Sequence, residues 1–175
     1  MQTFLPYSDF TASAKVLDNK RLNKQIVEAY QIYTGRVPQK NHPACLMWEG
    51  YKAYLILYIY AMCKEYKERF DKTHSVMREL FTDEPFFAVF AVAVAKCALP
   101  YHLTDPLIQI SHCVNLIRKD SRHYGHKLRS RLYGLSQMMY GRYVELDEYP
   151  TGYYWPVEPV GKKARQDREN WLNFK

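Results

Sequence analysis

The sequence predicts an all-α protein, a compact single-domain helical bundle. Three observations support this fold class. Apolar residues recur at helical spacing over residues 17–33, and large apolar residues fill residues 44–70 in the same way. Proline and glycine fall where these helices are expected to begin and end. With 175 residues, of which 47% are hydrophobic, the chain is long enough to bury one core.

The first helix is expected to run from about Asp9 or Ser13 to Tyr33, with Gly35 ending it. Two faces are expected along residues 17–33 of this helix. One face is apolar and is expected to pack on the core; it contains Leu22, Ile26, Ala29, Tyr30 and Tyr33. The other is polar and contains Arg21, Lys24, Gln25 and Glu28, with Lys20 beside them.

Two interpretations of this polar face are open. In the first, the cations hold a phosphate backbone and Glu28 takes part in chemistry. In the second, the face is simply solvated and carries an ordinary helix-surface ion pair between Lys24 and Glu28, which are four residues apart.

Further helices are expected along the rest of the chain, at about 44–70 after Pro43, 74–81, 85–98 and 106–119. For the apolar segment 85–98 a buried strand is the alternative. Residues 118–131 are the most basic part of the chain, and residues 149–156 are aromatic and turn-like. A domain is therefore expected over residues 1–160, followed by a charged surface tail over 161–175.

Composition indicates an anionic partner. The net charge is +7 and the isoelectric point about 9.1, with 16 tyrosines and three tryptophans. Aromatic side chains among cations favour nucleic acid over a lipid surface. Four scattered cysteines predict reduced thiols, and the absence of a signal-peptide pattern predicts a cytoplasmic protein. The longest apolar run, 85–95, is too short to span a bilayer, so no membrane association is expected.

Three segments carry chemically useful side chains. The first is the polar face with Glu28. The second is residues 110–120, where one helix face gathers Ser111, His112, Asn115, Arg118 and Lys119. The third is the aromatic patch at 149–156. Each has an alternative interpretation. His112 would be a satisfied interfacial histidine, and residues 118–131 would be a solvated basic surface. Residues 149–155 would simply pack on the core.

Several segments, in order along the chain, resemble the pyrimidine-dimer DNA glycosylase family, in its broad bacterial and phage branch. They are Met-Gln-Thr-Phe-Leu-Pro-Tyr at 1–7, Leu-Asp-x-Lys-Arg-Leu-x-Lys-Gln-x-Val-Glu at 17–28, Asn-His-Pro-Ala-x-x-Met-Trp at 41–48, Ser-His-x-x-Asn-Leu-Ile-Arg-Lys-Asp at 111–120 with His-Tyr-Gly at 123–125, and Tyr-Tyr-Trp-Pro at 153–156.

The resemblance implies the all-α domain of the T4 endonuclease V type, which binds duplex DNA, kinks it and flips a base. It implies catalysis by an N-terminal amine and a glutamate on the first long helix, which matches Glu28, with Arg21 in place of a basic or imidazole residue. The implied catalytic residues are Met1, Gln2, Arg21 and Glu28. Together with the polar and basic faces described above, the residues expected to bind DNA are Lys20, Lys24, Gln25, His42, His112, Asn115, Arg118, Lys119, Arg122, Tyr153, Tyr154 and Trp155.

Two departures from the family pattern affect the expected mechanism. Residue 2 is Gln2, a bulky residue that normally leaves the initiator methionine in place, so the nucleophilic amine is expected on Met1 unless processing exposes Gln2. Residues 126–148 are longer and more basic than is usual in this branch, which would widen the DNA footprint or change the base that is accepted.

The sequence therefore predicts a monomeric DNA glycosylase that excises a damaged or modified pyrimidine, with AP-lyase activity through a Schiff base, and that needs no metal or organic cofactor. Two alternatives are open. A DNA-binding module on the same scaffold would recognise modified bases without cleaving DNA. An interaction protein would dock an acidic partner on its basic face.

Overall fold

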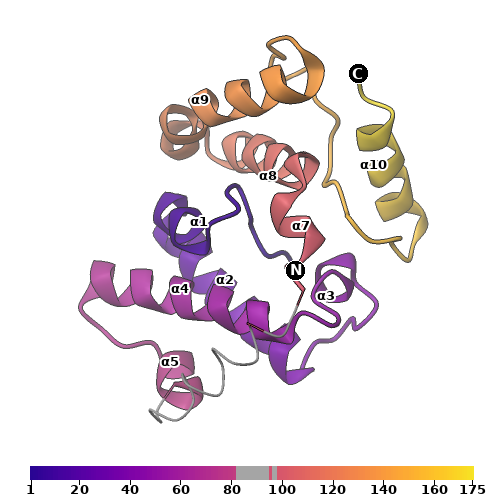
Figure 1. Ribbon diagram of the computed structural model, residues 1–175. Helices are drawn as coiled ribbons and strands as arrows, with labels where there is room; N and C mark the ends of the chain where they lie inside the picture. Colours follow the sequence, from indigo (N-terminus) through magenta and orange to yellow (C-terminus); the bar gives the residue numbers. More distant parts are fainter. Residues whose placement is uncertain (82–94, 96–97) are drawn as a thin grey trace.

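The computed structural model describes residues 1–81, 95 and 98–175. In this part of the chain the regular structure is helical and no strand occurs, which confirms the all-α prediction (Figure 1). The helices are α1 (Phe10–Val16), α2 (Asn19–Thr34), α3 (Pro43–Leu46), α4 (Lys52–Phe70), α5 (Ser75–Leu80), α7 (Tyr101–Thr104), α8 (Pro106–Lys119), α9 (Ser121–Tyr140) and α10 (Lys162–Leu172).

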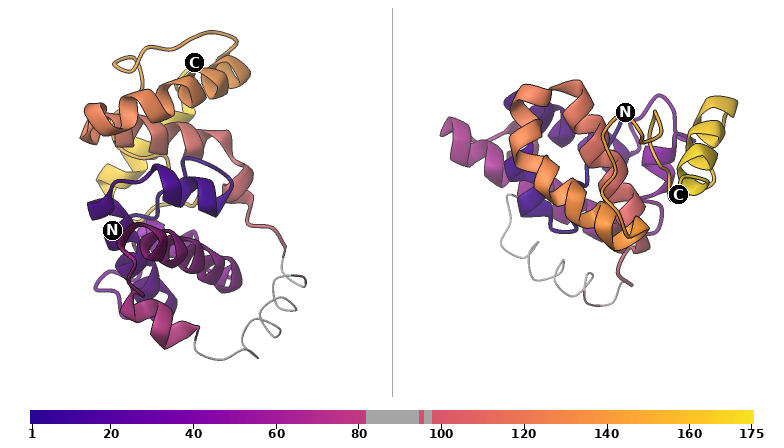
Figure 2. Two further views of the ribbon diagram at one scale, coloured as in Figure 1. Left: turned by 90° about the vertical axis from the view of Figure 1, so that its left-hand side faces the viewer. Right: turned by 90° about the horizontal axis from the view of Figure 1, so that it is seen from above.

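Two groups of helices enclose the beginning of the chain. Helix α4 packs on α1 and α2, and α8 packs on α9. The extended segment 1–7 runs between the two groups (Figures 1 and 2). From α4, the Tyr58 hydroxyl lies 3.2 Å from the carbonyl oxygen of Phe4. From the other side, the amide of Leu5 donates to His112 Nδ1 on α8 at 2.7 Å, and Arg131 Nε on α9 donates to the carbonyl of Pro6 at 2.6 Å. The N-terminus is therefore held inside the fold.

The first predicted helix is in fact two helices, because the chain turns at Leu17 and Asp18. Leu17 is extended (φ −65°, ψ 144°) and ends α1. Asp18 is also extended, and its Oδ1 accepts a hydrogen bond at 2.9 Å from the amide of Arg21, as an N-cap residue does. Arg69 of α4 braces this corner, since its guanidinium donates to the carbonyls of Ala14 and Leu17.

The second predicted helix is also divided, into α3 and α4. Gly50 lies between them with φ +79°, in the left-handed region that glycine tolerates. Helices α5 and α8 agree with the predicted helices at 74–81 and 106–119. The apolar segment predicted at 85–98, as a helix or a strand, lies almost entirely outside the described residues.

The segment expected as a surface tail forms α10 and contributes to the core. Its Trp171 is 1% exposed and stacks on Tyr149, with ring centroids 5.9 Å apart and planes inclined by 25°. No helix among the described residues combines the length and apolar character needed to cross a bilayer. The same residues contain no cluster of three potential metal ligands.

Candidate active site

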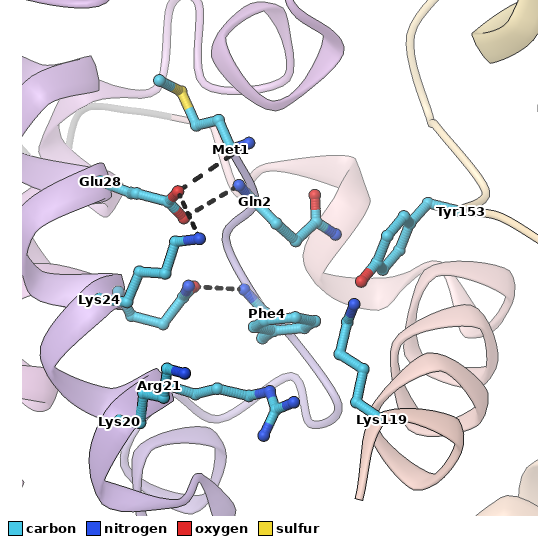
Figure 3. A pocket seen from close by; sticks show the side chains of 10 residues that line it. Met1, Gln2, Phe4, Lys20, Arg21, Lys24, Glu28, Lys119 and Tyr153 are labelled. Carbon is cyan, nitrogen blue, oxygen red and sulfur yellow. Dashed lines mark hydrogen bonds and ion pairs between the residues drawn. The ribbon is translucent and has the colours of Figure 1, made fainter.

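A pocket of about 320 Å³ opens where segment 1–7, the polar face of α2, the end of α8 and the loop before α10 meet. Figure 3 shows the side chains around it. They come from four separate parts of the sequence and are Met1, Gln2, Phe4, Lys20, Arg21, Lys24, Gln25, Glu28, Lys119 and Tyr153. The pocket thus brings together every residue predicted as catalytic and five of those predicted to bind DNA.

Glu28 lies at one end of this pocket with nitrogen atoms on two sides. Its Oε2 accepts a hydrogen bond at 3.1 Å from the amide of Gln2. Its Oε1 lies 3.9 Å from the α-amine of Met1 and 3.7 Å from Nζ of Lys24 (Figure 3). The Glu28 side chain is 12% exposed whereas that of Lys24 is 65% exposed. A largely enclosed carboxylate therefore faces the N-terminal amine.

Gln25 fixes the position of that amine. Its side chain is 1% exposed, and its Oε1 accepts hydrogen bonds from the amide of Phe4 at 2.8 Å and from the Tyr58 hydroxyl at 2.7 Å. An extended segment has unpaired backbone amides that must find partners when they are buried. The enclosed side chain of Gln25 therefore anchors segment 1–7, whereas a contact with DNA was predicted for it.

His112 has a similar place on the opposite side of the segment. It is 1% exposed, and its Nδ1 accepts the hydrogen bond from the amide of Leu5. Burial lowers the pKa of His112 to about 3, so the ring is neutral. A contact with DNA was predicted for His112, but its burial and hydrogen bonds agree with the alternative of a satisfied interfacial histidine.

The other end of the pocket is built around Asp18, at the beginning of α2. Asp18 forms an ion pair with the guanidinium of Arg21 and accepts a hydrogen bond at 2.5 Å from the Tyr124 hydroxyl. Burial would raise the pKa of Asp18, but these hydrogen bonds outweigh it and the pKa falls to about 2. Arg21 also lies over the Tyr124 ring, 5.5 Å from its centroid. The guanidinium of Arg21 is thereby held at the pocket wall.

Tyr153 closes the pocket from the C-terminal loop, and α8 positions this loop. Asn115 Nδ2 donates to the carbonyl of Gly152 at 2.6 Å, and the amide of Tyr154 donates to Ser111 Oγ at 2.9 Å. Lys119 Nζ lies 6.0 Å from the centroid of the Tyr153 ring. Burial raises the pKa of Tyr153 to about 12, so the phenol stays protonated. The loop therefore presents an aromatic ring and an ammonium group to the cavity.

Arg118, unlike its neighbour Lys119, is occupied with the protein itself. Its guanidinium donates to the carbonyls of Leu146, Tyr149 and Pro150 at 2.7–2.8 Å. These bonds hold the chain between α9 and the aromatic loop. Arg118 is therefore a residue that orders this loop, in contrast to the phosphate contact that was predicted for it.

The remaining predicted DNA-binding residues do not line this pocket. His42 caps α3 and meets the Trp155 ring edge-on at 5.5 Å; both line a second pocket of about 480 Å³. Tyr154 and Trp155 are 7% and 5% exposed, which agrees with the alternative that this segment packs on the core. Arg122 is exposed in the first turn of α9.

Three residues of the site were not among the predicted ones. Phe4 forms a pocket wall, and Asp18 with Tyr124 holds Arg21. A signal for Asp18 is present in the sequence, since an aspartate directly before a periodic segment is a typical N-cap. Phe4 and Tyr124 had no such local signal, because their contacts join distant parts of the chain.

Residues 1–78 match the family model for pyrimidine dimer DNA glycosylase. The resemblance inferred from the sequence motifs is thereby confirmed. The enzymes of that family are DNA glycosylases, and the match covers 78 of the 175 residues. It includes Met1, Arg21 and Glu28 but ends before the residues that Lys119 and Tyr153 contribute to the pocket. Comparison with curated proteins and with solved structures gives no further match.

Proposed function

We propose that the protein is a DNA glycosylase with AP-lyase activity whose nucleophile is the α-amine of Met1. The observation that carries the proposal is the approach of this amine to the Glu28 carboxylate, at 3.9 Å, in a pocket with cations on its walls. An amine nucleophile is needed for a Schiff base, and a carboxylate beside it can receive the proton that the amine loses on attack.

The proposed reaction begins at C1′ of the damaged nucleotide. The neutral amine attacks this carbon and gives a proton to Glu28, while the bond from C1′ to the base nitrogen breaks and the base leaves with the electron pair and takes up a proton from water. The nitrogen lone pair then breaks the C1′–O4′ bond, O4′ takes up the proton held by Glu28, and an iminium ion forms between C1′ and the amine. The Glu28 carboxylate removes a C2′ proton, the C3′–O bond breaks with the phosphate as leaving group, and water hydrolyses the iminium to free the enzyme.

Glu28 is the group placed to move protons in these steps, and Gln2 orients it. The backbone amide of Gln2 donates to Oε2, which leaves Oε1 toward the two amines. Before it takes up the amine proton, the ionised Glu28 carboxylate places negative charge beside the sugar, where positive charge develops as the base departs.

The cations of the pocket supply affinity for the DNA backbone. Lys20, Lys24 and Lys119 are exposed around the opening, and Arg21 is fixed at its wall by Asp18. Phosphate contacts of this kind bind duplex DNA without reading its sequence. The ring of Tyr153 adds a surface on which an unstacked base can lie.

Trapping with borohydride tests the proposal. The protein is incubated with duplex DNA that contains an abasic site, or with UV-irradiated duplex, and the iminium ion is reduced. A covalent adduct is expected, together with release of the damaged base from the irradiated duplex. Binding without adduct or base release would contradict the proposal and favour the DNA-binding module without cleavage.

Lys24 is the competing nucleophile, because its Nζ also approaches Glu28. A glycine added before Met1 moves the α-amine away from Glu28 and leaves Lys24 in place, whereas Lys24→Met does the opposite. We expect the glycine extension to abolish the adduct and Lys24→Met to keep it. The reverse result would assign the nucleophile to Lys24.

A further inference from the structure

We propose that the side-chain amide of Gln2 is a specificity-determining group that donates a hydrogen bond to a carbonyl oxygen of a pyrimidine held in the pocket. The proposal rests on the proposed function, because it requires a damaged base to enter this pocket. It concerns the side chain of Gln2 alone, whereas the mechanism above uses only the backbone of that residue.

The protonation of His112 sets the orientation of the Gln2 amide. Nδ1 of His112 accepts the hydrogen bond from the Leu5 amide at 2.7 Å, so this nitrogen carries no proton. A neutral imidazole has one proton, which must then lie on Nε2. The burial that lowers the pKa of His112 agrees with a neutral ring. His112 therefore presents an N–H donor to Gln2.

The side-chain carbonyl oxygen of Gln2 must accept the hydrogen bond from this donor. One of the two terminal atoms of the Gln2 amide lies 2.5 Å from His112 Nε2. Two N–H donors do not bond to one another, and the oxygen and nitrogen of a glutamine amide are distinguished by such partners. The amide is therefore turned so that Oε1 accepts from His112, which puts the NH₂ group at the other position.

That other position has no hydrogen-bond partner among the described residues and is buried. Gln2 as a whole is 6% exposed and lines the pocket. Its side chain extends from the N-terminal segment toward Tyr153, across the space between Glu28 and that ring (Figure 3). A buried polar group without a partner is rare in native proteins. A ligand that brings an acceptor to this position would satisfy it.

The rings around Gln2 favour a base as that ligand. The rings of Phe4 and Tyr153 lie 6.2 Å apart, and each lies within 6 Å of the His112 ring. An unstacked base can pack against such aromatic faces. Thymine and uracil present carbonyl oxygens where cytosine presents an amino group at position 4. An N–H donor on Gln2 can therefore form a hydrogen bond with the position-4 oxygen of thymine or uracil, but not with the amino group of cytosine.

Binding measurements test the proposal without depending on catalysis. The dissociation constant is measured in a Glu28→Gln background for a duplex with a thymine dimer and for the same duplex with a tetrahydrofuran abasic analogue. We expect Gln2→Met to reduce the preference for the dimer by about 3- to 10-fold, the effect of one neutral hydrogen bond. Gln137→Met, an exposed substitution of the same kind on α9, should leave this preference unchanged.

A second variant covers the case in which Gln2→Met fails to fold. Gln2→Glu keeps an acceptor for His112 but presents an oxygen to the base, so it should reduce the preference at least as much. An unchanged preference in a folded variant, or no preference without these substitutions, would overturn the proposal. Failure of the proposed function would appear elsewhere, as the absence of a borohydride adduct with abasic DNA.

Discussion

Two carboxylates at opposite ends of one pocket have very different surroundings. Asp18, before the first turn of α2, accepts short hydrogen bonds from the Tyr124 hydroxyl and the Arg21 amide and pairs with the Arg21 guanidinium. Glu28, further along the same helix, accepts one backbone hydrogen bond, and two amines stay 3.7 and 3.9 Å from it.

The difference separates a carboxylate that holds the structure from one that is available for chemistry. The donors near Asp18 form hydrogen bonds with it that fix the start of α2 and the position of Arg21. The amines beside Glu28 are close enough to exchange protons with it through a small movement, and one of them is the free end of the chain. We therefore assign stability to Asp18 and proton transfer to Glu28.

The largest effect is expected for Glu28→Gln. The amide keeps the size of the side chain and can still accept from the Gln2 backbone, but it no longer takes up a proton. Base release should fall by roughly 10²- to 10⁴-fold, the usual effect of general acid–base catalysis. Single-turnover kinetics with irradiated duplex measure this fall, and a gel-shift assay should show that DNA binding persists. Turnover at the original rate would show that Glu28 does not take part in catalysis.

Asp18→Ala should instead reduce stability. It removes an N-cap, an ion pair and the partner of the Tyr124 hydroxyl, at a cost of about 1–3 kcal/mol in the free energy of unfolding. Urea unfolding followed by circular dichroism measures the loss. A variant as stable as the original protein would show that the corner at Leu17 and Asp18 does not depend on these contacts.

The stability that Asp18 contributes should depend on pH in acid solution. The pKa of Asp18 lies at about 2 in the folded protein, below its ordinary value of 3.8. A depressed carboxyl pKa contributes stability above the unfolded pKa, and this contribution is lost as the pH falls through the folded pKa. The stability difference between the original protein and Asp18→Asn should therefore be constant above pH 5 and shrink between about pH 4 and pH 2. A constant difference over this range would contradict the assignment.

A smaller effect distinguishes the two neighbouring cations at the end of α8. Lys119 is exposed and lines the pocket, whereas Arg118 is tied to three backbone carbonyls. Lys119→Ala should lower the slope of log affinity against log salt by about 0.9, as one lost phosphate contact does. Arg118→Ala should change this slope less and lower the thermal stability more. Equal slopes and equal stabilities for the two variants would remove the distinction.

Local patterns predicted the helices and the polar face of α2, because both depend on residues close together in the sequence. They also indicated Arg21 and Glu28. The same patterns placed Gln25 and His112 among the DNA contacts, because both look like surface residues on their helices. Both are buried because an extended segment from the other end of the chain needs partners for the amides of Phe4 and Leu5. Such a requirement becomes visible only when the segment is placed between α2 and α8.

The attachment point of trapped DNA tests the central claim, that the fold holds the Met1 amine beside Glu28 as the nucleophile. The borohydride-reduced adduct is digested with trypsin and nuclease and analysed by mass spectrometry. The account predicts that the sugar remnant lies on the α-amine of the peptide Met1–Lys15. A remnant on Lys24, or on any other side chain, would contradict it.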